Sequence, residues 1–88
     1  MRKIETKEDL KVEHYYRTTD HFFRVDSIVD GEPHGSKYHI FQIEPIITIN
    51  TPLGIFVEKM GCIEIFEEEY KETFQRILIK NQDNEQRN

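Results

Sequence analysis

Residues 62–80 read CIEIFEEEYKETFQRILIK, and the spacing of the apolar side chains changes inside this stretch. Residues 62–66 have the two-residue period of a short β-strand. From Glu67 onward the period is about 3.6 residues, which places one apolar stripe on a helix. The stripe consists of Tyr70, Phe74, Ile77 and Leu78. The stretch therefore predicts a strand followed directly by an amphipathic C-terminal helix.

The charges of this segment agree with a helix over 67–80. Glu67, Glu68 and Glu69 occupy the expected first turn, whereas Arg76 and Lys80 lie near the expected end. This distribution complements the helix dipole. Residues 81–88 contain no apolar side chain to bury. The sequence thus predicts one domain over 1–80 and a polar, disordered tail over 81–88.

The chain before the helix alternates between apolar and polar residues in several short runs, which is typical of strands. A loop is predicted over 30–36, where two glycines and a proline make a connection too long for a tight turn. A hairpin with a type I turn is predicted at Thr51–Gly54. Residues 6–9 could equally start a short helix. The predicted strands are 10–16, 21–29, 38–44, 46–50, 55–59 and 62–66.

These elements predict an α+β fold: an antiparallel sheet of five or six strands, open or curled toward a small barrel, with the C-terminal helix packed across it. Adjacent aromatic pairs such as Phe22 and Phe23 must point to opposite faces of a strand. One helix leaves too many large side chains uncovered, among them Tyr38 and Ile40. Either the sheet closes on itself, or a second chain covers the remaining face.

Composition narrows the function classes. The chain has 88 residues, 36% of them hydrophobic and 33% charged, which is enough for one small core. A net charge of -5 argues against nucleic acid as a partner. Cys62 is the single cysteine and is expected to be a buried core residue, which fits a reducing compartment. With no signal-peptide or membrane-spanning run, a cytoplasmic protein is expected.

The four histidines, His14, His21, His34 and His39, share no metal-binding spacing such as HxH or HExxH. With a loop at 30–36, His21 and His39 approach each other only through a strong register offset. No metal ligand, cofactor or catalytic residue is therefore assigned, and an enzyme is the less favoured interpretation. The histidines are expected on the surface or in loops.

The sequence favours a non-catalytic binding or regulatory protein that acts through protein–protein association, such as an inhibitor of a larger macromolecule. A homodimer or other homo-oligomer is the expected state, with a protein partner as a further expectation. The alternative is a small-molecule or nucleotide binder, with or without hydrolytic activity, whose pocket forms at a subunit interface. The binding residues expected are Tyr16, His21, Arg24, Tyr38 and His39.

Overall fold

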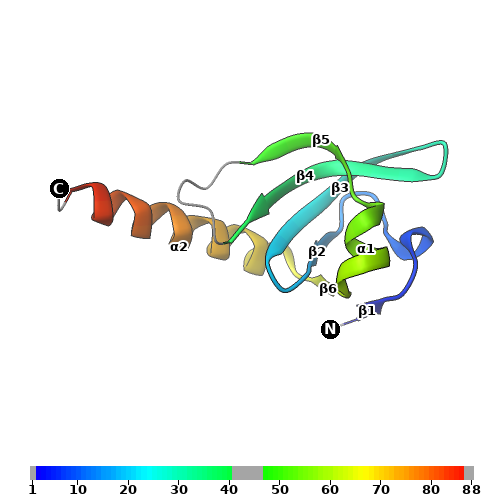
Figure 1. Ribbon diagram of the computed structural model, residues 1–88, viewed down its shortest axis with the longest axis horizontal. Helices are drawn as coiled ribbons and strands as arrows, with labels where there is room; N and C mark the ends of the chain where they lie inside the picture. Colours follow the sequence, from blue (N-terminus) through cyan, green and yellow to red (C-terminus); the bar gives the residue numbers. More distant parts are fainter. Residues whose placement is uncertain (1, 41–46, 87–88) are drawn as a thin grey trace.

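The computed structural model describes residues 2–40 and 47–86, and describes the side chains of all of these except 60 and 80–86. Within these residues the chain forms strands, two α-helices and a short 3-10 helix (Figure 1). The elements are β1 (Lys3–Ile4), η1 (Lys7–Asp9), β2 (Tyr15–Arg17), β3 (His21–Val29), β4 (Glu32–His39), β5 (Thr48–Pro52), α1 (Gly54–Met60), β6 (Cys62–Ile65) and α2 (Glu67–Gln86).

The six strands found in 2–40 and 47–86 form one sheet in the order β1-β6-β2-β3-β4-β5. Every neighbouring pair is antiparallel. Within the described residues β1 and β5 stand at opposite ends of this order and do not pair with each other, so the sheet is open there and the barrel alternative is wrong. Figure 1 shows α2 running past the sheet toward the C-terminus, whereas α1 lies against the strands at the other end of the molecule. The α+β fold predicted from the sequence is confirmed.

The long loop predicted at 30–36 is wrong, because a two-residue turn joins β3 to β4. Val29 pairs with Glu32, which leaves only Asp30 and Gly31 in the turn. Both have positive φ, 52° and 78°, as a type I′ turn requires. Asp-Gly is among the strongest short hairpin signals. The nearby Pro33 favoured a loop instead, because proline is disfavoured inside strands, yet it lies within β4. The hairpin is therefore centred on residues 30–31, nearer the N-terminus than the middle of the predicted loop.

The strand predicted over 55–59 is also wrong, because this segment is the helix α1. Leu53, Phe56 and Val57 are buried, whereas Ile55 is 51% exposed. Burial at i, i+3 and i+4 is the helical period, so the side chains pack as a helix in spite of their β-branched composition. Gly61, with φ 50°, follows the last helical residue.

The N-terminal prediction is partly wrong. The chain between 10 and 14 is not a strand, and only Tyr15–Arg17 pair as β2. The helical alternative for residues 6–9 is confirmed by η1, and Leu10 after it is buried. Strand β1 was not predicted from the sequence. Residues 41–44 of the predicted third strand, and residue 46 of the predicted fourth strand, lie outside the described residues.

Two apolar clusters lie on the two faces of the sheet. The first gathers around α1 and comprises Ile4, Leu10, Tyr16, Phe23, Val25, Leu53, Phe56, Val57 and Cys62. The second lies under α2 and comprises Phe22, Tyr38, Ile65 and Tyr70, with further apolar side chains against it. The chain's own segments thus cover both faces. Tyr38 and Ile40, which were expected to stay uncovered by the C-terminal helix, pack with side chains of α2, and α1 covers the opposite face.

Helix α2 has the bounds Glu67–Gln86 and so extends past Lys80, where the sequence predicted its end. The division into a domain over 1–80 and a disordered tail over 81–88 stays a prediction. Neither α1 nor α2, over the residues that the structure describes, is both long and apolar enough to span a membrane.

Buried tyrosines predict a loss of stability at alkaline pH. Burial raises the pKa of Tyr16 and of Tyr70 to about 12, and it also raises the pKa of Tyr38. Because the folded-state pKa values lie above the ordinary value near 10, the stabilisation is complete below pH 10 and is lost as the pH rises through the folded values. Between pH 10 and its folded-state pKa, each tyrosine should lower the free energy of unfolding by up to about 1.4 kcal/mol per pH unit. Urea unfolding between pH 8 and pH 12 measures this, and a flat profile would contradict the burial.

Candidate functional site

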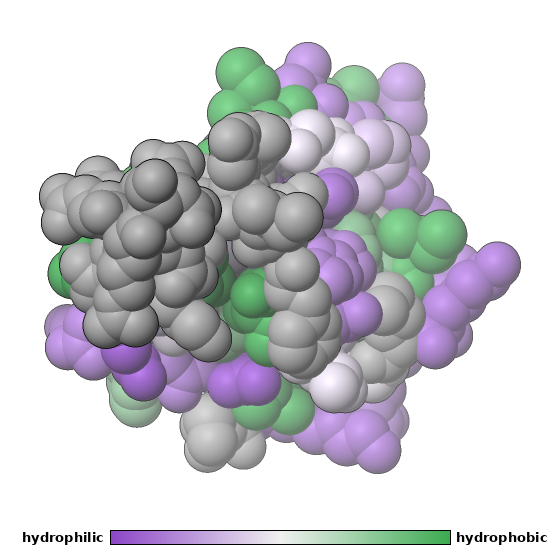
Figure 2. Space-filling view, turned by 60° about the vertical axis from the view of Figure 1, so that its left-hand side comes forward, coloured by the Kyte–Doolittle hydropathy of each residue, from purple (hydrophilic) through white to green (hydrophobic). Residues whose placement is uncertain are grey.

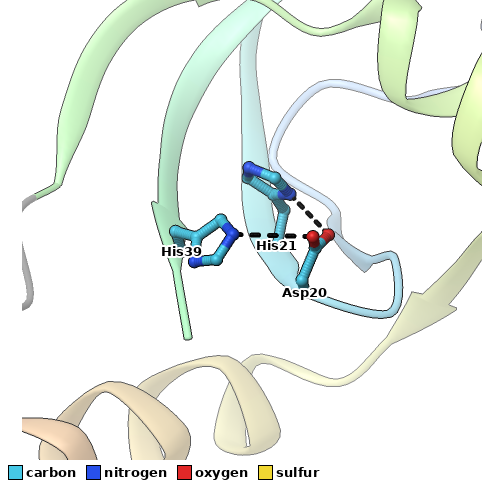
Figure 3. Close-up of side chains that lie close together, drawn as sticks. All are labelled: Asp20, His21 and His39. Carbon is cyan, nitrogen blue, oxygen red and sulfur yellow. Dashed lines mark hydrogen bonds and ion pairs between the residues drawn. The ribbon is translucent and has the colours of Figure 1, made fainter. Parts of the chain in front are cut away.

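Asp20, His21 and His39 converge at one end of the β3–β4 hairpin (Figure 3). His21 is the first residue of β3, His39 is the last residue of β4, and the two are direct partners in the antiparallel register. Asp20 precedes β3 in the turn that leads from β2. The close approach of the two histidines follows from the two-residue turn at 30–31, so no register offset is needed.

The Asp20 carboxylate stands between the two imidazoles. Its Oδ1 lies 2.7 Å from Nδ1 of His21, and its Oδ2 lies 3.5 Å from Nε2 of His39. The two histidine rings meet edge to face with centroids 4.5 Å apart. The hydrogen bond from His21, aided by the charges of both histidines, lowers the pKa of Asp20 against the opposing effect of burial. Asp20 is thus held as a carboxylate.

The backbone around Asp20 is fixed by the buried side chain of Thr18. The Thr18 hydroxyl accepts hydrogen bonds from the backbone N–H groups of Asp20 and His21, at 3.4 and 3.1 Å, and donates to Asp20 Oδ1 at 3.2 Å. This is a hydroxyl-stabilised turn of the kind that Ser and Thr favour. On the β4 side, the N–H of Ile40 donates to the backbone oxygen of Asp20 at 2.9 Å. The carboxylate is therefore positioned from both strands.

Helix α1 forms one wall of this cluster, and the other side reaches solvent. The Phe56 ring lies 4.8 Å from the His21 ring, centroid to centroid. The His21 side chain is 15% exposed, and those of Asp20 and His39 are each 28% exposed. The cluster is therefore accessible to a small ion but is partly shielded from water on the α1 side.

The three side chains offer a chemically suitable set of metal ligands. Two imidazole nitrogens and one carboxylate oxygen lie within 4.8 Å of one another. Zn²⁺ binds such groups at about 2.0–2.2 Å, which places neighbouring ligand atoms about 3–3.5 Å apart. The three ligand atoms, now up to 4.8 Å apart, would have to draw closer to reach this spacing. For His21 to bind through Nδ1, its ring would have to carry the proton on Nε2, because a ligating nitrogen must be unprotonated.

The five residues expected to bind do not form one site. His21 and His39 come together on the α1 side of the sheet. Tyr16 is buried on that same side, where its hydroxyl accepts a hydrogen bond from the N–H of Lys11 at 2.8 Å.

Arg24 and Tyr38 lie on the opposite face of the sheet. Successive side chains of a strand alternate between the two faces, and each of these residues is an odd number of positions from the histidine of its own strand. The Tyr38 hydroxyl donates to the backbone oxygen of Tyr70 at 2.7 Å. A pocket that combines the two histidines with Arg24 within one chain is not present among the described residues.

The binding residues chosen from the sequence omit Asp20, although it holds the cluster together. The signal that would have found it is the Asp-Gly dipeptide at 30–31, because it fixes the hairpin register and hence the pairing of His21 with His39. The remaining histidines lie elsewhere: His14 Nδ1 is 3.4 Å from Glu64, and His34 Nδ1 is 3.0 Å from the backbone oxygen of Glu32.

Comparison of the chain with protein-family models, with curated proteins and with solved structures gives no match. The functional conclusion therefore rests on the geometry of the chain itself.

Proposed function

We propose that the protein is a binding protein for a divalent transition-metal ion, such as Zn²⁺, held by Asp20, His21 and His39. The observation that carries this proposal is the in-register pair of histidines flanking one carboxylate. Imidazole and carboxylate groups are the ordinary protein ligands of Zn²⁺. Near neutral pH an aspartate side chain is ionised at its ordinary pKa, so a proton does not compete for the Asp20 oxygens.

Three protein ligands leave a fourth position of a tetrahedral ion for water or for a group from a partner. The ion would join the start of β3, the end of β4 and the turn before β3. Since hydrogen bonds to Thr18 already order this turn, part of the entropy cost of fixing it is met before the ion binds. The site would thus tie the open end of the hairpin together and leave one coordination position of the ion open.

Association with another protein or with a second copy stays a prediction from the sequence. Its remaining support is the exposure of single apolar side chains, such as Ile49 at 73% and Phe66 at 77%. On the face drawn in Figure 2, the hydrophobic residues form separate patches among hydrophilic ones. Scattered apolar residues are ordinary on protein surfaces, whereas a contiguous patch marks an interface. Metal binding is therefore the function that the geometry favours.

Titration of the metal-free protein with Zn²⁺, followed by calorimetry and by thermal unfolding, tests the proposal. One ion per chain is expected, and Zn²⁺ at a hundred times its Kd should stabilise the fold by about 2.7 kcal/mol. That corresponds to a rise in Tm of roughly 10 °C or more for a domain of this size. The variants Asp20→Asn and His39→Gln should each weaken binding by about tenfold or more.

The matched control is His34→Gln, which removes a histidine from the same strand but outside the cluster. It should bind Zn²⁺ as the wild type does. Equal Zn²⁺ affinity in wild type and His39→Gln, or no saturable binding by the wild type, would refute the proposed function.

A further inference from the structure

A cleft of about 380 Å³ lies between α2 and the face of the sheet opposite the histidine cluster. Its apolar side chains are Phe22 of β3, Ile40, which directly follows β4, and Ile77 of α2. Its charged side chains are Arg17 of β2 and, on α2, Glu69 and Arg76. The volume is within the range of small-molecule sites, and an apolar lining with a few charged groups is their usual composition.

The charges in the cleft do not cancel. Arg17 NH1 lies 3.6 Å from Glu69 Oε2, so these two side chains form an ion pair. The Arg17 guanidinium also lies over the Phe22 ring, 4.7 Å from its centroid, which holds the cation at the wall of the cleft. Arg76 is exposed and makes no ion pair within the described part of the chain. One positive charge therefore remains, in a protein whose overall charge is -5.

We propose that this cleft binds a small organic monoanion, namely a carboxylate with a short alkyl or aryl body. The body would lie against the half-buried side chains of Ile40 and Ile77, where burial of apolar surface supplies most of the affinity. The carboxylate would pair with Arg76, because a guanidinium matches the two oxygens of a carboxylate with two parallel hydrogen bonds. The already ion-paired Arg17 adds positive potential beside it.

The net charge of the cleft sets the ligand class. A cationic amphiphile of equal length meets both arginines and gains only Glu69, which is already engaged. A carboxylate without an apolar body gains the charge interaction alone, and such an exposed pair is worth little. Both the negative charge and the apolar body are therefore required. The cleft lies on the other face of the sheet from Asp20, His21 and His39, so this inference stands independently of metal binding.

Titration of the full chain with octanoate, followed by two-dimensional ¹H–¹⁵N NMR, tests the inference. Saturable shifts are expected for the amides of Ile40, Thr73 and Ile77, which line the cleft. Octylamine and acetate, each at the same concentrations, should produce no saturable shift. Arg76→Gln should weaken octanoate binding by about threefold to fivefold, because it removes an exposed but unpaired cation.

The matched control is Arg24→Gln, which removes an arginine from the same face of the sheet but outside the cleft. It should leave octanoate binding unchanged. Arg76→Gln should fold as the wild type does, because its side chain is exposed. Equal octanoate affinity in Arg76→Gln and wild type, equal binding of octylamine, or shifts that never saturate would each overturn the inference.

Discussion

Gly35→Ala is expected to lower the free energy of unfolding by more than about 3 kcal/mol. A Cβ atom at this position would overlap the backbone carbonyl oxygen of Arg24 and would stand only 3.0 Å from the backbone nitrogen of Asp26. Gly35 pairs with Val25 of β3 on one side and with Thr51 of β5 on the other. Since both neighbours are strands of the same sheet, β4 has no free side toward which it can move.

The comparison variant is Gly31→Ala in the turn of the same hairpin. A Cβ there meets no atom within 4 Å, so only the positive φ of 78° opposes the substitution. That strain is worth roughly 1–2 kcal/mol. Urea unfolding of the two variants side by side checks the difference, and a Gly35→Ala protein within about 1 kcal/mol of wild type would contradict the register of β3, β4 and β5.

Phe56→Ala should lower the free energy of unfolding by about 3–5 kcal/mol. The Phe56 side chain is 6% exposed, and its ring stacks on that of Phe23 with centroids 5.4 Å apart. Removing the ring leaves a cavity between α1 and the sheet, inside the apolar cluster around α1. The loss should appear as a lower urea midpoint with a two-state transition.

Ile55→Ala is the matched control, because Ile55 precedes Phe56 in α1 but is half exposed. It should change the stability by no more than about 0.5 kcal/mol. Equal losses in the two variants would mean that α1 does not present its Phe56 face to the sheet, and the account of how the second face is covered would be wrong.

Patterns that extend over many residues predicted the fold well. The apolar stripe of the C-terminal helix and its acidic first turn are clear over four turns, and Tyr70, Phe74 and Ile77 do pack on the sheet. The nine residues of β3 were also predicted with their observed bounds. In β3, Phe22 and Phe23 belong to different clusters, as the alternation of strand side chains requires.

Short segments were predicted poorly because tertiary contacts decide them. Ile55 and Val57 favour a strand by composition, and five residues are too few to separate the two periods. The helical signal is visible only when Leu53 and Gly61 are read together with Phe56 and Val57. Leu53, Phe56 and Val57 are buried at helical spacing, and the glycine follows where the helix ends.

The candidate metal site could not be predicted from ligand spacing, since His21 and His39 are far apart in the sequence. Their contact depends on one turn, and a shift of the turn by a few residues would move His39 away from His21. Because the predicted loop at 30–36 would keep His21 and His39 apart, the sequence did not favour a metal site. The closeness of Asp20 to both histidines depends in addition on the Thr18 hydroxyl, whose role in the turn no spacing rule predicts.

The most direct measurement is an anomalous difference map, recorded at the zinc edge, from crystals of the protein grown with one equivalent of Zn²⁺. The account predicts one peak per chain, at about 2.0–2.2 Å from an oxygen of Asp20 and from one ring nitrogen each of His21 and His39. A peak only at other residues, such as His14 with Glu64, would contradict it. So would the absence of a peak together with an intact hydrogen bond between His21 and Asp20.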